Sequence, residues 1–235
     1  MITLHAMATP NVVKVLLMLE ELGAAYRVER RDVILGEGHD PVFLALNPVG
    51  KVPVLTDEDG PGGAPITLFE SGAILIYLAE KAGRFLPADG AGRYHVMKWL
   101  MFQMAGVGPM FGQAIHFRSG PPGSDYARDR YRTEMRRLTD VIEGRLSEAA
   151  YLGGDDYSIA DMAVFPWMRT LERFFPEAVA GSATTRWRAE IAARPATERA
   201  LAQADALGAQ DMASMKSATR DDLDRYFGRG AYARA

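Results

Sequence analysis

The chain has 235 residues, enough for one large core or two small domains, and its composition of 48% hydrophobic and 24% charged residues is that of a globular protein. Its net charge of −3 predicts neither nucleic-acid nor membrane partners, because no broad basic field is implied. The absence of cysteine excludes structural disulfides, thiolate metal sites and a cysteine nucleophile. The N-terminus lacks a signal-peptide pattern and no apolar run reaches membrane-spanning length, so we expect a soluble cytoplasmic protein.

The first part of the chain alternates strand-like and helix-like runs, as βαβ units do. Apolar residues spaced three and four apart predict a first helix that stops at Gly23, and a turn is predicted at residues 59–63. Further helices are expected at residues 41–46 and 71–81, and strands at residues 2–5, 26–32, 52–55 and 66–69. The predicted order of elements is therefore β-α-β-α-β-β-α.

Beyond a linker at residues 87–92 the periodicity is helical throughout. Two apolar stripes, over residues 97–104 and 131–146, are interpreted as core filling, and the methionines of the first as adaptable core residues. Helices are expected at residues 159–174, with a bend at Pro166, and at residues 184–193 and 196–207. Residues 212–235 are polar with isolated aromatics, and they either pack over the body or stay loose.

The sequence Ser158-Ile159-Ala160-Asp161 stands at the head of an apolar run with the spacing of a reciprocal helix N-cap. The Ser158 hydroxyl can accept the Asp161 amide hydrogen, and the Asp161 carboxylate can reach back to the Ser158 amide. A carboxylate in the first turn also opposes the helix dipole favourably. We therefore predict that these two residues stabilise the fold and take no part in chemistry.

Thr9-Pro10-Asn11 lies where the first predicted helix begins, at the edge of the sheet where open α/β folds bind ligands. As a structural device, Thr9 is an N-cap followed by proline at the first helical position. As a functional device, a hydroxyl, a side-chain amide and a helix N-terminus together can stabilise a thiolate. The residues alone leave both interpretations open.

Two further motifs are expected at the same edge. From the residues alone, Val52-Pro53 is the start of an edge strand. Ser71 is expected to cap the next helix under either interpretation, whereas a cap does not need the carboxylate of Glu70 just before it. The four histidines have no zinc spacing, and we expect no metal.

The Ser-Ile-Ala-Asp box after the Gly-rich segment 153–156, and the order of the first elements, resemble those of cytosolic glutathione transferases. Thr-Pro-Asn, the run at residues 68–75, Gly-Pro-Met with Gly-Gln nearby, and Arg-Pro-Ala-Thr are similar to the bacterial Nu class, which works mainly as a glutathione-dependent disulfide-bond reductase. The resemblance runs from about residue 1 to 205. It implies an α/β thioredoxin-like domain over residues 1–81 and an all-α helical domain over residues 90–208, and it does not cover the expected tail at residues 209–235.

The resemblance also implies roles for single residues around glutathione. Thr9 and Asn11 lie near the sulfur, and Val52, placed by a cis-Pro53, pairs with the cysteinyl backbone. Arg130 contacts the ligand from the other subunit of a homodimer.

The two ends of glutathione are assigned in the same way. Glu70 binds the ammonium of the γ-glutamyl end and Ser71 its α-carboxylate. Lys51 lies in the same motif as Pro53, and His39 lies in a loop where relatives often carry glutamine and reach the glycyl carboxylate.

Three functions are compatible with these residues. The leading hypothesis is an enzyme that reduces small disulfides with glutathione as co-substrate; the absence of cysteine suits it, because both sulfurs of the exchange can come from glutathione. The alternatives are conjugation, dehalogenation or isomerisation of an electrophile, and a non-enzymatic glutathione transferase-like binding protein. The retained Thr9-Asn11 and Glu70-Ser71 pairs argue against the last one.

Two expectations concern the helical domain. The helical stripes along residues 93–104 and 128–146 are expected to pair two subunits. The second-substrate pocket is expected to be apolar, with Met104, Met110, Phe111 and Phe117 as its lining.

Overall fold

The computed structural model describes residues 1–120 and 123–233, which form two compact units. The first unit combines Met1–Ile74 with the segment from Glu198 onward, and the second comprises Leu75–Thr197. The expected domain limits, 1–81, 90–208 and 209–235, stay a prediction, and residues 234–235 of the expected tail lie outside the described residues. None of the described helices is both long enough and apolar enough to span a membrane.

The first unit is built on a four-stranded sheet in the order β2-β1-β3-β4. The strands are β1 (Ile2–Ala6), β2 (Tyr26–Arg30), β3 (Val54–Asp57) and β4 (Ile66–Phe69). β1 pairs in parallel with β2 and antiparallel with β3, and β3 pairs antiparallel with β4. The last residues of β1 and β4 therefore lie at the same end of the sheet as the first residue of β3, so the three predicted motifs start from one edge.

Three helices follow these strands in the chain: α1 (Pro10–Leu22), α2 (Pro41–Leu46) and α3 (Ser71–Ala82). Helix α1 ends at Gly23, which adopts the left-handed conformation at φ 61° that glycine tolerates, as the sequence predicts. All residues from Val12 to Leu19 are buried, so this helix is enclosed and not merely amphipathic. The predicted order β-α-β-α-β-β-α is confirmed.

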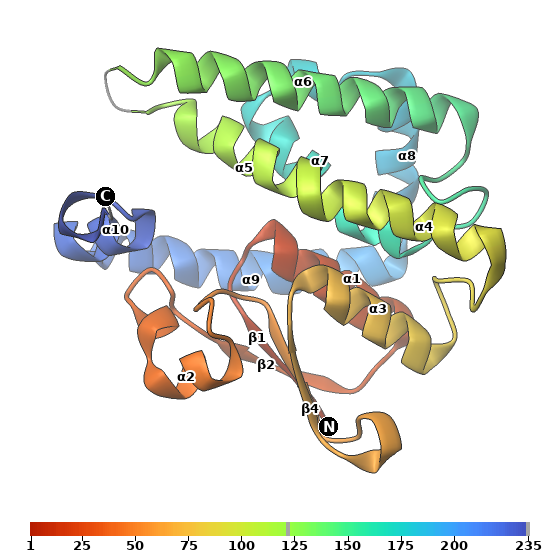
Figure 1. Ribbon diagram of the computed structural model, residues 1–235, viewed down its shortest axis with the longest axis horizontal. Coiled ribbons are helices and arrows are strands. Elements are labelled where there is room, and N and C mark those ends of the chain that lie inside the picture. The colour runs from red at the N-terminus through yellow and green to blue at the C-terminus, as the bar shows by residue number, and fades with distance from the viewer. Residues whose placement is uncertain (121–122, 234–235) are drawn as a thin grey trace. The chain divides into compact units, whose positions relative to one another are not determined.

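Two helices at the end of the chain return to the first unit. These are α9 (Pro195–Ser217), which runs beside α1, and α10 (Arg220–Phe227) beyond it (Figure 1). Arg199 of α9 donates to Glu20 of α1 at 2.6 Å. The expected helix at 196–207 thus continues for a further ten residues, to Ser217, and the residues after it are not loose: Thr219 and Asp222 form a capping box at the start of α10.

The second unit is helical. Its helices are α4 (Gly90–Phe102), α5 (Gly108–Phe117), α6 (Asp125–Glu148), α7 (Ile159–Phe174) and α8 (Ser182–Ala192), with a π-helical segment at Gln103–Val107 between α4 and α5. Glu143 of α6 accepts the Ala183 and Thr184 amides at 3.1 and 2.8 Å, which fixes the start of α8 against α6. Met135 is fully buried as expected, but Met101, assigned to the same kind of core stripe, is 45% exposed.

Asp161 is the polar centre of the second unit. Its carboxylate accepts the Ser158 amide at 3.0 Å, as the predicted capping box requires, and Ser158 Oγ accepts the Ala160 amide at 3.3 Å. The same carboxylate accepts the Leu152 amide and Trp187 Nε1, both at 2.9 Å. The predicted N-cap is confirmed, and this fully buried carboxylate also joins a loop and helix α8 to α7.

Asp161→Ala is expected to lower the free energy of unfolding by about 3 kcal/mol or more, because it leaves buried donors without an acceptor. The matched control is Asp156→Ala, an exposed neighbour whose loss is expected to cost less than about 0.5 kcal/mol. Urea unfolding of both variants measures the difference. Equal midpoints for the two variants would contradict the role assigned to Asp161.

Candidate functional site

Helix α1 begins at a turn that follows β1. Thr9 has extended backbone angles (φ −112°, ψ 152°), and its Oγ1 accepts the Val12 amide at 3.2 Å. A hydroxyl that accepts this bond still has its hydrogen to donate elsewhere. The cap is therefore present, and it is compatible with a second role for Thr9 as a donor to a ligand. Asn11 stands in the first turn, and both residues are half-buried.

The same turn is held by a residue that the sequence reasoning missed. Asp211 of α9 accepts the Ala8 amide at 2.7 Å, directly before Thr9. Its other oxygen accepts from Arg30, at the end of β2, at 3.0 Å. Asp211 stands inside the segment that was expected to be a tail, and no local pattern connects it with a turn two hundred residues earlier.

The approach to β3 contains the expected cis peptide bond, between Val52 and Pro53. Val52 is buried, and the loop before it is fixed by the Asn47 side chain. Asn47 Nδ2 donates to the Lys51 carbonyl at 2.7 Å, and its Oδ1 accepts the Val49 amide at 3.0 Å. The backbone of this segment is thus held by a buried amide and not by the sheet.

Two glycines bring the loops of His39 and Lys51 together. A Cβ added to Gly38 would lie 2.5 Å from the Gly50 carbonyl oxygen, and a Cβ added to Gly50 would lie equally close to the Gly38 carbonyl oxygen. Only glycine at both positions permits this backbone approach. It places His39 and Lys51, both exposed, on adjacent loops. Lys51 Nζ also lies 5.6 Å from the centre of the Tyr226 ring of α10.

Glu70 and Ser71 mark the passage from β4 to α3. Glu70 has φ 71°, a left-handed conformation that a residue with a side chain seldom adopts and that often marks a functional site. Its carbonyl accepts the Ile74 amide at 3.0 Å, so Glu70 occupies the N-cap position and Ser71 is the first helical residue. The cap expected at Ser71 therefore lies one residue earlier. The Ser71 hydroxyl instead contacts another helix.

That contact is with Lys14, a residue that the sequence reasoning did not single out. Lys14 is completely buried, and its Nζ donates to Ser71 Oγ at 3.1 Å. Burial lowers the pKa of Lys14 to about 7, and the negative charge of Glu70 acts in the opposite direction. A lysine inside an otherwise apolar run of eight residues was a signal that could have drawn attention to it.

Most of the predicted site residues belong to the first unit, and Arg130 is the exception. It lies on α6 in the second unit and is exposed. Phe111, expected in a second-substrate pocket, is fully buried and so belongs to the core. Within the described residues, no three histidine, cysteine, aspartate or glutamate side chains are grouped as a metal site would require.

Comparison with known families identifies both parts of the chain. Residues 8–81 match the glutathione S-transferase N-terminal domain, and residues 104–195 match the glutathione S-transferase C-terminal domain.

Individual relatives agree with this assignment. The chain is 42% identical over 206 residues to the disulfide-bond oxidoreductase YfcG of Escherichia coli, covering 87% of this chain and 96% of the relative. It is 38% identical to the disulfide-bond oxidoreductase YghU of the same organism, over 83% of this chain and 72% of the relative. A glutathione transferase family member from Pseudomonas fluorescens, solved with two glutathione molecules bound, has a TM-score of 0.81 and 41% identity, covering 85% and 92% of the two chains. A glutathione transferase from Pseudomonas putida, solved with glutathione disulfide, has a TM-score of 0.80 and 41% identity over 85% and 90%.

Proposed function

Because this chain belongs to the glutathione S-transferase family, we propose that it is a glutathione-dependent enzyme that reduces small disulfides, as a member of the Nu class. The observation that carries the proposal is the convergence of three motifs at one end of the sheet: the Thr9 turn after β1, the cis Val52–Pro53 bond before β3, and Glu70 after β4. Two relatives named disulfide-bond oxidoreductases support the choice of reaction.

The proposed binding mode follows the chemistry of each motif. The γ-glutamyl ammonium pairs with the Glu70 carboxylate, and its α-carboxylate accepts from Ser71 at the start of α3. The cysteinyl backbone pairs with the main chain of Val52. This order directs the sulfur toward Thr9 and Asn11.

The glycyl carboxylate is assigned to the loops joined by Gly38 and Gly50. The His39 imidazole and the Lys51 ammonium are the side-chain hydrogen-bond donors assigned to it on these loops. Both side chains are exposed, as that of Glu70 is, so we expect solvent to screen their contacts with the ligand.

The proposed reaction has two exchange steps. The thiolate of a first glutathione attacks a disulfide, forming a mixed disulfide and releasing one thiolate, which takes up a proton. A second glutathione attacks the mixed disulfide and releases the other thiol together with glutathione disulfide. Two thiols are oxidised while one disulfide is reduced, and the protein carries no covalent intermediate. One relative was solved with two glutathione molecules, which are the reductant of this reaction. Another was solved with glutathione disulfide, which is the oxidised product.

The direct experiment is a comparison of two reactions with the purified protein. We expect glutathione-dependent reduction of 2-hydroxyethyl disulfide to proceed well above the uncatalysed rate and to exceed the conjugation of an aryl halide. Faster conjugation would replace the proposal with the alternative in which glutathione is added to an electrophile.

Thr9→Val is expected to slow disulfide reduction more at about pH 6 than at about pH 9, because donors to a thiolate lower its pKa and free glutathione is itself ionised at high pH. The control is Thr9→Ser, which keeps both the hydroxyl and the helix cap. The measurement is kcat/KM for glutathione across this range. A defect of constant size would mean that Thr9 positions the sulfur and does not influence its ionisation.

Glu70→Gln is expected to weaken glutathione binding by roughly ten- to a hundredfold, the usual loss for a charge-assisted contact. Glutamine keeps the size of the side chain, so the melting temperature should change little. Isothermal titration calorimetry measures the affinity, with Glu58→Gln as a control at an exposed glutamate in the same unit. Unchanged affinity in Glu70→Gln would place the γ-glutamyl group elsewhere.

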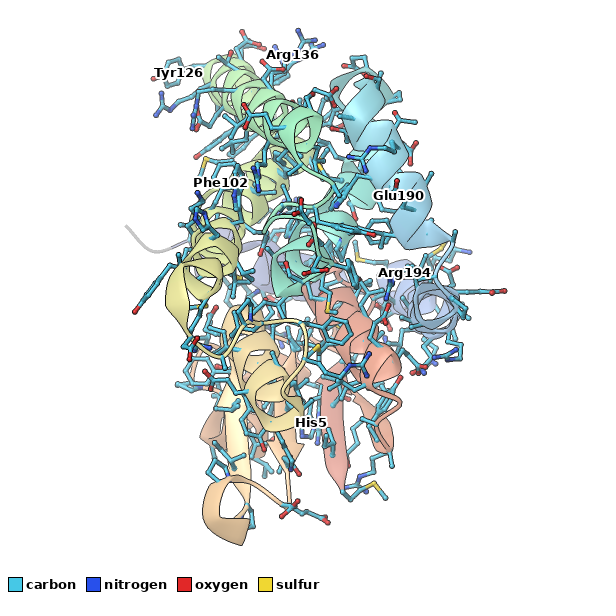
Figure 2. The ribbon with its side chains drawn as sticks, turned by 90° about the vertical axis from the view of Figure 1, so that its right-hand side faces the viewer. His5, Phe102, Tyr126, Arg136, Glu190 and Arg194 are labelled. Atoms are coloured by element: carbon cyan, nitrogen blue, oxygen red, sulfur yellow. The ribbon has the colours of Figure 1, made fainter. Side chains whose placement is uncertain are left out.

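We also propose that the enzyme is a homodimer that works in the cytoplasm, where a reducing glutathione pool can drive the exchange. Large exposed side chains on two long helices support a subunit interface: Tyr94 is 74% exposed on α4, and Tyr126 is 78% exposed on α6. Tyr126 and Arg136 extend outward from α6 (Figure 2). Analytical ultracentrifugation at micromolar concentration is expected to show a dimer; a monomer would also remove Arg130 as a ligand from a second subunit.

A further inference from the structure

Lys14 is an ionisable residue within a run of apolar residues in α1. Every residue from Val12 to Leu19 is buried, and the Lys14 side chain has no exposed surface. Burying a charged group is unfavourable unless partners compensate for it. One partner lies on the neighbouring helix: Ser71 Oγ is 3.1 Å from Lys14 Nζ, and Ser71 is the residue to which the γ-glutamyl α-carboxylate is assigned.

We propose that Lys14 is a positioning residue for that α-carboxylate: it orients the Ser71 hydroxyl toward the ligand and supplies positive charge behind it. This inference rests on the proposed function, because it takes the γ-glutamyl group to lie at Glu70 and Ser71. It assigns to α1 a role in recognising the substrate that is separate from the Thr9 turn.

The orientation follows from the hydrogen-bonding capacity of the two groups. In its charged form Lys14 has only donors, so Ser71 Oγ then accepts in the contact between the two side chains. The single hydroxyl hydrogen of Ser71 then points away from Nζ. A hydroxyl that accepts from an ammonium is also polarised and becomes a stronger donor. A carboxylate at the start of α3 is the kind of acceptor that this arrangement favours.

The charge on Lys14 can respond to the ligand. Burial lowers the pKa of Lys14 to about 7, so in the free protein at neutral pH the side chain is divided between its charged and neutral forms. A bound carboxylate nearby stabilises the charged form and raises this pKa. Glutathione binding near neutral pH should therefore take up a proton at Lys14, and the contribution of Lys14 to affinity should fall as the pH rises above the raised pKa.

Glu70 is the charged group whose field acts on Lys14. Charged pairs elsewhere in the first unit include Glu20 with Arg199, Asp211 with Arg30, and Glu29 with Arg31. His39 lies on the loop assigned to the opposite end of the ligand.

The test uses S-methylglutathione, which has no thiol proton to complicate the measurement. Calorimetry at about pH 7 in two buffers of different ionisation enthalpy gives the number of protons taken up on binding; we expect about half a proton for the wild-type protein, because a group at its pKa is half protonated. The uptake should fall to near zero in Lys14→Met, which keeps the length of the side chain without its charge. Lys216→Met, at an exposed lysine of α9, should behave as the wild type does.

A second ligand separates the inference from the proposed function. S-methylglutathione with its α-carboxyl group amidated should bind the wild type about tenfold or more weakly and without proton uptake, and this loss should be much smaller in Lys14→Met. An equal loss in both proteins, or no proton uptake by the wild type, overturns the role of Lys14 and leaves the proposed function intact. No loss in the wild type shows that the α-carboxylate is not bound at Ser71, and the proposed binding mode fails as well. If Lys14→Met does not fold, the wild-type protein alone still tests the proposal: proton uptake should accompany binding of S-methylglutathione and be absent with the amidated ligand.

Discussion

Helix α1 is enclosed from Val12 to Leu19, and this burial is the constraint that fixes the parts of the site relative to one another. Its first turn starts from the end of β1, so the Thr9 cap is placed by the sheet. Its buried length carries Lys14 to Ser71, at the start of α3. A helix enclosed in this way cannot rotate or slide without opening the core. The sulfur end and the γ-glutamyl end of the proposed ligand site are thus held by one rigid element.

The return of the chain through α9 reinforces the same turn. Asp211 accepts the Ala8 amide and the Arg30 guanidinium, so one carboxylate joins the ends of β1 and β2. Glu20, at the other end of α1, is held by Arg199. These contacts join residues about 180 to 200 positions apart in sequence. In the first unit, the turn that carries Thr9 is therefore held by a residue near the end of the chain, although the family match to the N-terminal domain covers only residues 8–81.

The features that the sequence predicts correctly are those decided by neighbours a few residues apart. The Thr9 cap and the Ser158–Asp161 box use groups three positions apart, and apolar periodicity places most helices and strands. Helix α10 is not among the predicted helices, although its signals are local: Thr219 and Asp222 form a capping box, and Leu223, Tyr226 and Phe227 have helical spacing. The contact of Lys14 with Ser71 joins residues 57 positions apart, which no local pattern encodes.

Lys14 illustrates how a fold retains an unfavourable group. An apolar side chain of similar length at this position would avoid the cost of burying an ammonium, and replacing buried charges by apolar residues is often neutral or stabilising. The same holds for Glu70, whose left-handed conformation glycine would adopt without strain. Both residues are less favourable for folding than the alternatives: Glu70 directly precedes α3, and Lys14 reaches Ser71, the first residue of α3, from α1. Two such costs at the contact between these helices are what the proposed site for an ammonium and a carboxylate requires.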